Sequence, residues 1–120
     1  MAGAAQNAIN EATAVSRLRY ETAARMTLGQ ALLRLQHHER AEAELRAALA
    51  GAEALTHPPT LWLAWWHLGR ALTATGDDAG AADAFAKAAE IIRGFAAGLG
   101  PTWSERILAA EPVREILASA

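Results

Sequence analysis

Cysteine is absent from this 120-residue sequence, and valine, lysine and long apolar runs are scarce. The absence of cysteine excludes disulfides, thiolate nucleophiles and cysteine-ligated zinc. Because there are only two valines, the β-branched enrichment typical of strands is missing. No segment reaches the roughly 18 apolar residues that cross a bilayer, and no basic stretch followed by an apolar run opens the chain. These absences predict a soluble cytoplasmic protein with no membrane partner.

The charge balance argues against nucleic acid as a partner. Eleven basic and 13 acidic residues give a formal net charge of −2, which supplies no electrostatic footprint for nucleic acid. Nucleic-acid binding would need a basic stripe along one helix, built from Arg17, Arg19, Arg25 and Arg34. About a quarter of the chain is alanine, and leucine, glutamate and arginine are also abundant. These are strong helix formers, so the composition predicts a single all-α domain.

Helix breakers divide the chain into short helices. Residues 56–59, Thr-His-Pro-Pro, are the strongest breaker, because a proline disfavours helical geometry in the residue before it. Gly76 can take the left-handed conformation that ends a helix. The apolar spacing predicts helices over residues 1–15, 18–35, 39–55, 61–75, 79–97, 102–110 and 112–118. The capping groups expected are Ser16, Thr60, either Asp77 or Asp78, and a capping box formed by Thr102 and Glu105.

Two blocks of sequence match at a constant offset of 40 residues. The first block reads Leu28-Gly29-x-Ala31-Leu32 and the second reads Leu68-Gly69-x-Ala71-Leu72. Ala41 and Ala81, Leu45 and Phe85, and Ala48 and Ala88 continue the match. The small residues at Gly69 and Ala81 allow two helices to pack closely, while larger side chains fill the space around them. A helix pair repeated at a fixed interval is typical of a helical solenoid.

The second block resembles the tetratricopeptide repeat family. Trp65-x-x-Leu68-Gly69-x-x-Leu72 is similar to the first-helix motif of that family, and Ala81-x-x-x-Phe85 is similar to the second-helix motif. The first block departs from the pattern, with Arg25 in place of the tryptophan and Gln36 in place of the turn glycine, and Arg93 replaces the usual proline after the second helix. The offset exceeds the family's roughly 34 residues, which predicts a longer second helix or a longer loop before Leu61.

The resemblance implies two helical hairpins, a leading helix and a short C-terminal cap. Repeat one is expected over about residues 22–55, repeat two over about 61–95, and the cap over about 102–118. The residues expected to form the packed repeat motif are Leu28, Gly29, Leu32, Ala41, Leu45, Ala48, Trp65, Leu68, Gly69, Leu72, Ala81, Phe85 and Ala88. Residues 95–117 also resemble the C-terminal tetratricopeptide region of large bacterial ATPase, cyclase and transcriptional regulators. The nucleotide-binding and DNA-binding parts of those regulators have no counterpart here, so their activities do not transfer.

No catalytic, metal or cofactor site is expected. The run His37-His38-Glu39 is interpreted as a solvated turn, because adjacent side chains on a helix diverge too far to share one ion. Asp77 and Asp78 are interpreted as caps, His57 as an exposed loop residue, and His67 as packed, although a groove-facing contact stays open. Gly94, Gly98 and Gly100 follow no strand and precede no lysine, which excludes a phosphate loop. We therefore expect a protein that is not an enzyme.

The resemblance implies that the first helix of each pair lines a concave face that binds peptides or partner helices. The residues expected on that face are Met26, Gln30, Leu33, Trp66, Arg70 and Thr73. Trp66 and Arg70 are the preferred contact residues, because tryptophan and arginine are enriched at binding hot spots. An alternative is that Trp66 only covers a neighbouring helix. The basic and asparagine residues with which some family members hold a C-terminal carboxylate are not at matching places, which argues against a chaperone-tail adaptor.

The function expected is therefore non-catalytic protein–protein interaction or self-association. Two repeats and a cap are few for a solenoid, so residues 5–33 are expected to offer an apolar flank to another copy or to preceding repeats of a longer array. The alternative is a sensor for a small ligand or peptide on the surface formed by Trp62, Trp66, His67 and Arg70. A closed apolar pocket beside Arg70 would favour the sensor, and an open groove would favour the interaction module.

Overall fold

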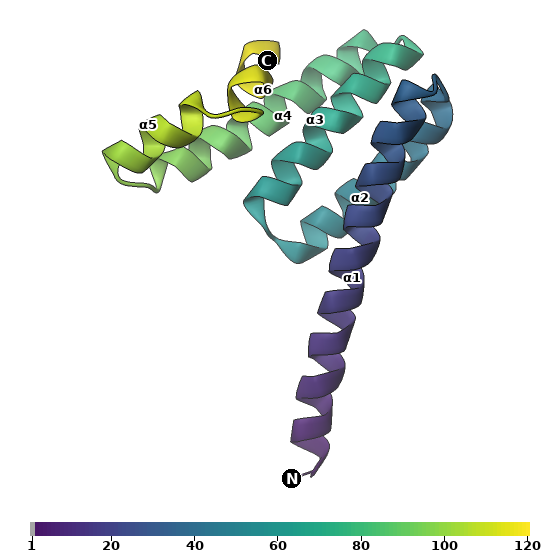
Figure 1. Ribbon diagram of the computed structural model, residues 1–120, viewed down its shortest axis with the longest axis vertical. Helices are drawn as coiled ribbons and strands as arrows, with labels where there is room; N and C mark the ends of the chain where they lie inside the picture. The colour runs from purple at the N-terminus through teal and green to yellow at the C-terminus, as the bar shows by residue number, and fades with distance from the viewer. Residues whose placement is uncertain (1) are drawn as a thin grey trace.

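The chain folds into helices joined by short turns, as shown by a computed structural model that describes residues 2–120 (Figure 1). No strand occurs in this part of the chain, which confirms the all-α prediction. None of the helices described is long and apolar enough to cross a membrane. The helices are α1 (Ala2–Arg34), α2 (His38–Leu55), α3 (Pro58–Thr75), α4 (Asp78–Ala97), α5 (Pro101–Ala109) and α6 (Val113–Ser119).

The first four helices form two hairpins that stack side by side. α1 packs on α2 and α3 packs on α4, while α2 also packs on α3. The C-terminal helices α5 and α6 fold back onto α4, so the second hairpin is covered at its far side (Figure 1). The N-terminal half of α1 extends beyond the rest of the molecule, and residues 3–17 are all exposed. The fold is helical and repeat-like, with a long leading segment and a short C-terminal cap.

The two hairpins close on the same contact, 40 residues apart. In the first hairpin, a β-carbon placed on Gly29 would lie 2.5 Å from Cγ of Leu45. In the second hairpin, a β-carbon placed on Gly69 would lie 2.6 Å from Cε1 of Phe85. Both glycines are therefore required by close approach of the helices rather than by backbone conformation. The duplicated contact confirms that the sequence match reflects two equivalent helix pairs.

Two apolar clusters hold the hairpins and the cap together. The first lies where the hairpins meet and is centred on the fully buried Leu45 and Leu68. The second lies where α3 and α4 meet α6, and it contains Trp62 and Trp66 together with Ile92 and Ile116. Alanines make up more than half of the buried residues of the first cluster, so the helix backbones approach closely there. The cap thus belongs to the core and is not a loose tail.

The turns between helices follow the expected chemistry in part. Gly76 ends α3 in the left-handed region at φ 89°, and Asp77 caps α4 by accepting a hydrogen bond from the Gly80 amide at 2.9 Å. His57, exposed as expected, caps α3 in place of the predicted Thr60, whose amide donates to the His57 ring at 3.4 Å. The prediction of Thr60 was wrong because the two prolines that precede it fit the first helical positions, where no amide hydrogen is needed.

Two further predictions of helix starts were wrong. Ser16 begins no helix, because α1 is continuous from Ala2 to Arg34 and its alanine-rich first half contains no residue that breaks a helix. Thr102 and Glu105 form no capping box, since α5 already begins at Pro101, with Gly100 at the cap position. The link between α2 and α3 is only two residues long, so the 40-residue offset comes from longer helices and not from a longer loop.

Most of the predicted motif residues are buried, with instructive exceptions. Leu28 is 41% exposed, whereas its equivalent Leu68 is 1% exposed. The prediction of a packed Leu28 was wrong because α2 covers this face of α3, while no helix of the described chain covers it on α1. Trp65 and Phe85 are half-buried, and the Lys87 ammonium lies 4.5 Å from the centre of the Trp65 ring. The remaining motif residues are buried or are glycines in close helix contacts.

Candidate functional site: a groove between α1 and α3

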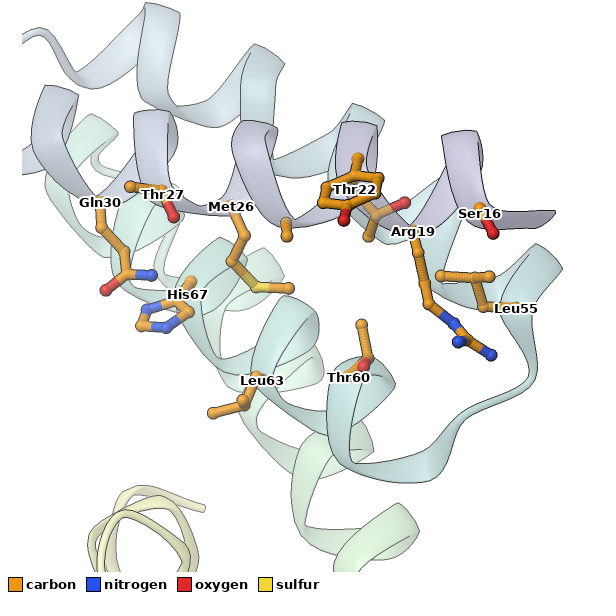
Figure 2. A pocket seen from close by; sticks show the side chains of 12 residues that line it. Ser16, Arg19, Thr22, Met26, Thr27, Gln30, Leu55, Thr60, Leu63 and His67 are labelled. Carbon is orange, nitrogen blue, oxygen red and sulfur yellow. The ribbon is translucent and has the colours of Figure 1, made fainter. Parts of the chain in front are cut away.

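A groove of about 620 Å³ lies between α1 and α3, the first helices of the two hairpins (Figure 2). This volume lies within the range of about 300–1,000 Å³ that is usual for ligand sites. The end of α2 closes one side of the groove through Leu55. The residues that line it are Ser16, Arg19, Tyr20, Thr22, Ala23, Met26, Thr27, Gln30, Leu55, Thr60, Leu63 and His67.

The groove is built from equivalent positions of the two hairpins. Each of three residues on α1 has its partner 40 residues later on α3, and both members of each pair line the groove. These pairs are Tyr20 and Thr60, Ala23 and Leu63, and Thr27 and His67. The groove therefore arises because two equivalent helices lie next to each other and present the same turns to the space between them.

The lining combines an apolar base with hydrogen-bond donors. Met26, Leu63 and Leu55 provide aliphatic surface on three different helices. Around them lie hydroxyl, amide and imidazole groups, and Arg19 extends toward the α2 side of the groove (Figure 2). Arg19 is the only charged residue in the lining, and no carboxylate lines the groove. The groove can therefore bury an apolar side chain while offering donors to acceptor groups nearby.

His67 is a buried polar residue of the groove. The residue is 6% exposed, and its Nδ1 lies 3.2 Å from a guanidinium nitrogen of Arg70. Because the guanidinium can only donate, Nδ1 must accept, and the proton of the neutral ring is on Nε2. Burial, together with the Arg70 charge, lowers the pKa of His67 to about 4. The imidazole is thus neutral near pH 7, with an Nε2–H donor on a residue that lines the groove.

The six residues predicted for the concave face do not lie together in the structure. Met26 and Gln30 line the groove. Leu33 packs against the apolar cluster between the hairpins instead. Thr73 is exposed on α3, and its hydroxyl donates to the Gly69 carbonyl at 2.9 Å, so it is paired within its own helix.

Trp66 and Arg70, the preferred contact residues, lie outside the groove lining. Trp66 is only 9% exposed and packs in the cluster between α3, α4 and α6. Trp66 therefore covers neighbouring helices, as the alternative interpretation stated. The prediction that Trp66 is an open contact residue was wrong. Arg70 is exposed, with its guanidinium 5.4 Å from the centre of the Trp66 ring and bonded to His67. Arg70 supports the groove through His67 and does not line it.

The residues that sequence reasoning missed lie on helix faces that the repeat match does not identify. The predicted positions on α3 were displaced around the helix toward α4 and α6, so Leu63 and Thr60 were overlooked. The 40-residue match identifies which α1 position corresponds to each α3 position, but it does not show which face of the helix meets its counterpart. Ser16 was interpreted as a cap between two helices, and Arg19 was considered only as part of a basic stripe.

Comparisons with known proteins add no name to this site. Searches against protein-family models, curated proteins and solved structures find no match to the chain. Across residues 2–120, no three histidine, aspartate or glutamate side chains lie together as a metal ion would require.

Proposed function

We propose that this protein is an interaction module that binds a peptide segment of a partner protein in the groove between α1 and α3. The observation that carries the proposal is the pairing of equivalent positions along a single groove of about 620 Å³. Tyr20 with Thr60, and Thr27 with His67, place matched contact points along the two helices. A segment lying between the helices would meet both rows together.

The openness of the groove favours a peptide over an enclosed small molecule. Arg19, Tyr20, Ala23 and Thr27 are all exposed, so the α1 wall faces solvent along much of its length. An enclosed ligand pocket would instead bury most of its lining residues. A closed apolar pocket beside Arg70 would favour a sensor, but Arg70 is exposed and does not line the groove.

The lining also indicates what the peptide should contain. An aliphatic side chain fits the base formed by Met26, Leu63 and Leu55. A nearby carboxylate would pair with Arg19, the only charge in the lining, and a peptide carbonyl could accept from His67 Nε2–H. Since no lining carboxylate repels it, an acidic segment is favoured over a basic one. The preferred segment is therefore an acidic one that carries leucine, isoleucine or methionine.

The test is selection of binders from a random displayed peptide library on the full chain, followed by fluorescence polarisation with the enriched peptides. We expect these peptides to be rich in acidic and aliphatic residues. Arg19→Glu should weaken their binding about tenfold or more, because a charge-assisted contact becomes a repulsive one. Arg17→Glu is the matched control, since Arg17 is exposed two residues away and does not line the groove.

A second pair of variants tests the shape of the groove. Ala23→Gln adds bulk to the α1 wall and should also weaken binding, whereas Ala43→Gln, on the exposed side of α2, should have no effect. Both alanines are exposed within helices, so folding should tolerate either change. Equal loss with both arginine variants, or no loss with Ala23→Gln, would contradict the proposed site.

The family and the natural setting are part of the same proposal. We infer from the motif at Trp65, Leu68, Gly69, Ala81 and Phe85 that the hairpins are tetratricopeptide-like repeats. The tail resemblance over residues 95–117 supports a role beside the signalling or transcriptional modules of a larger bacterial regulator. In that setting the groove would link such a regulator to a partner protein.

A further inference from the structure

His67 offers the groove a hydrogen-bond donor that the protein itself leaves unpaired. Its Nδ1 accepts from Arg70, so the proton of the neutral ring is on Nε2. Among the described residues Nε2 has no hydrogen-bond partner, and it is not one of the unpaired polar atoms that the protein encloses completely. Figure 2 shows the ring pointing into the space between α1 and α3, where Gln30 approaches from α1. A buried side chain, 6% exposed, therefore presents a free donor to the groove.

Two contacts hold Arg70 in the position that fixes this proton. Its guanidinium carbon lies 5.4 Å from the centre of the Trp66 ring, and one of its nitrogens lies 3.2 Å from His67 Nδ1. Trp66 is packed in the cluster between α3, α4 and α6, so it is a firm support. None of the salt bridges within the described chain involves Arg70. The guanidinium is therefore placed by Trp66 and His67 and not by an acidic partner.

The position of the proton decides what the groove can bind at this point. A neutral imidazole has one N–H donor and one bare nitrogen that accepts. A proton on Nδ1 would face the guanidinium, which has donors only, and Nε2 would then accept from a ligand. Burial and the Arg70 charge lower the pKa of His67 to about 4, so the Nε2–H donor carries no charge near pH 7. Such a donor suits a main-chain carbonyl, because the contact buries no charge.

Main-chain carbonyls are free in an extended segment but not inside a helix. In an α-helix each carbonyl accepts from the amide four residues further along, and only the last four lack a partner. In an extended segment outside a sheet, the carbonyls are free to accept from a binding protein. A buried donor left without an acceptor costs free energy. A helix that covered His67 Nε2 would therefore bind less tightly than an extended segment that supplied a carbonyl.

We propose that Arg70 is a positioning residue that holds the His67 proton on Nε2, and that this donor makes the groove select an extended segment through one of its main-chain carbonyls. The inference rests on the proposed function, because it names the contact between the groove and the main chain of the bound peptide. Arg19 pairs with an acidic side chain, whereas His67 binds a carbonyl that every residue possesses. Arg70 itself does not line the groove and acts only through His67.

The first measurement is a proton–nitrogen NMR correlation spectrum of the free full chain with nitrogen-15 in its histidines. It is recorded at about pH 8, well above the ordinary histidine pKa of about 6.5, so that neutral rings are compared. The spectrum distinguishes protonated from bare ring nitrogens, and the signals missing from His67→Gln assign this residue. We expect a bare Nδ1 and a protonated Nε2. Arg70→Glu replaces a donor by an acceptor, so Nδ1 should become protonated.

Two further variants keep this measurement decisive. Arg17→Glu makes the same charge change at an exposed position outside the groove lining, and it should leave the His67 signals unchanged. Arg70 is exposed, so the fold should tolerate its replacement, which circular dichroism checks. If Arg70→Glu does not fold, Arg70→Met removes the donor and should move the Nδ1 signal toward that of a protonated nitrogen. A proton on Nδ1 in the natural chain, or His67 signals that do not respond to loss of Arg70, would overturn the proposal.

The second measurement tests the carbonyl contact with an acidic peptide enriched in the library selection. In a set of analogues, one main-chain amide at a time is replaced by an ester, whose carbonyl is a weaker acceptor. One analogue should bind the natural chain about three- to tenfold more weakly, as expected for one neutral hydrogen bond. The same replacement should change binding to Arg70→Glu by less than about twofold, because Nε2 no longer donates. Loss of the peptide N–H would affect both proteins alike, so the difference between them isolates His67.

The outcomes separate this inference from the proposed function. If Arg19→Glu weakens binding but no ester analogue distinguishes the natural chain from Arg70→Glu, the groove is the binding site and the carbonyl contact is wrong. Helical carbon-13 shifts of the bound peptide at the ester-sensitive position would overturn the extended segment. If no enriched peptide responds to Arg19→Glu, the proposed function fails and the carbonyl contact fails with it. The NMR spectrum of the free chain then still decides whether Arg70 fixes the His67 proton.

Discussion

Replacing Gly29 by alanine tests the contact on which the first hairpin closes. The added methyl group would lie 2.5 Å from Cγ of Leu45, well inside van der Waals contact. Leu45 is 0% exposed and surrounded by other core residues, so it has no open space into which to move. Adding a methyl group to such a core costs roughly 1–3 kcal/mol. Alanine is also a better helix former than glycine, which offsets about 0.5–1 kcal/mol of this cost.

Gly94→Ala is the matched control that removes the helix-propensity contribution from the comparison. Gly94 lies within α4, is exposed, and a β-carbon placed there would meet nothing within 4 Å. This variant should therefore raise the free energy of unfolding by roughly 0.5–1 kcal/mol. The difference between the two variants isolates the helix contact and should be about 1–3 kcal/mol. Gly69→Ala should fall between them, because Phe85 is half-buried and its ring can turn toward solvent.

The assay is urea unfolding followed by circular dichroism, with the free energy of unfolding obtained by linear extrapolation. All variants should be compared at the same protein concentration. The reasoning would be refuted if Gly29→Ala stabilised the protein as much as Gly94→Ala does. That result would mean that the two helices are not held at the distance described.

Two further predictions concern burial and protonation. Leu68→Ala should lower the free energy of unfolding by about 2–5 kcal/mol, because Leu68 is buried. Leu28→Ala, at the equivalent exposed position, should change it by less than about 1 kcal/mol at dilute concentration. Equal losses for the two variants in urea unfolding would contradict the difference in burial. The folded-state pKa of His67 is about 4, below its ordinary value of 6.5, so the folded protein binds fewer protons between these values than the unfolded chain. The contribution of His67 to stability is therefore present above pH 6.5 and is lost as the pH falls toward 4. His67→Gln should flatten this part of the pH profile, and an NMR titration that places the His67 pKa at or above 6.5 would contradict the buried, Arg70-paired ring.

The helical class and the hairpin contacts could be predicted from sequence because they depend on local and repeated signals. Breakers such as Gly76 determine where helices end, and the match of Gly29 with Gly69 identifies positions where bulk is excluded. Ser16 was misleading because a residue that favours caps is also tolerated within a long alanine-rich helix when nothing else interrupts it. A repeat match gives correspondence between helices but not the angle at which they face one another.

Burial of the candidate site could not be predicted because it depends on what lies next to each helix. Trp66 and Met26 occupy equivalent positions, yet α6 covers the first and the groove borders the second. Leu28 and Leu68 differ in the same way, since α2 covers only Leu68. Helices at the two ends of a repeat array have different neighbours from helices in its middle. The sequence of one helix does not say which neighbours that helix has.

The most direct test of the central claim is an NMR map of where a selected acidic peptide binds. The methyl groups of Met26 and Leu63, which lie on opposite helices of the groove, should shift on binding. The methyl groups of Leu28, which is exposed on α1 outside the groove lining, and of Val113, in the buried cap, should remain in place. Shifts confined to Leu28 or Val113, with Met26 and Leu63 unchanged, would contradict the groove between α1 and α3 as the binding surface.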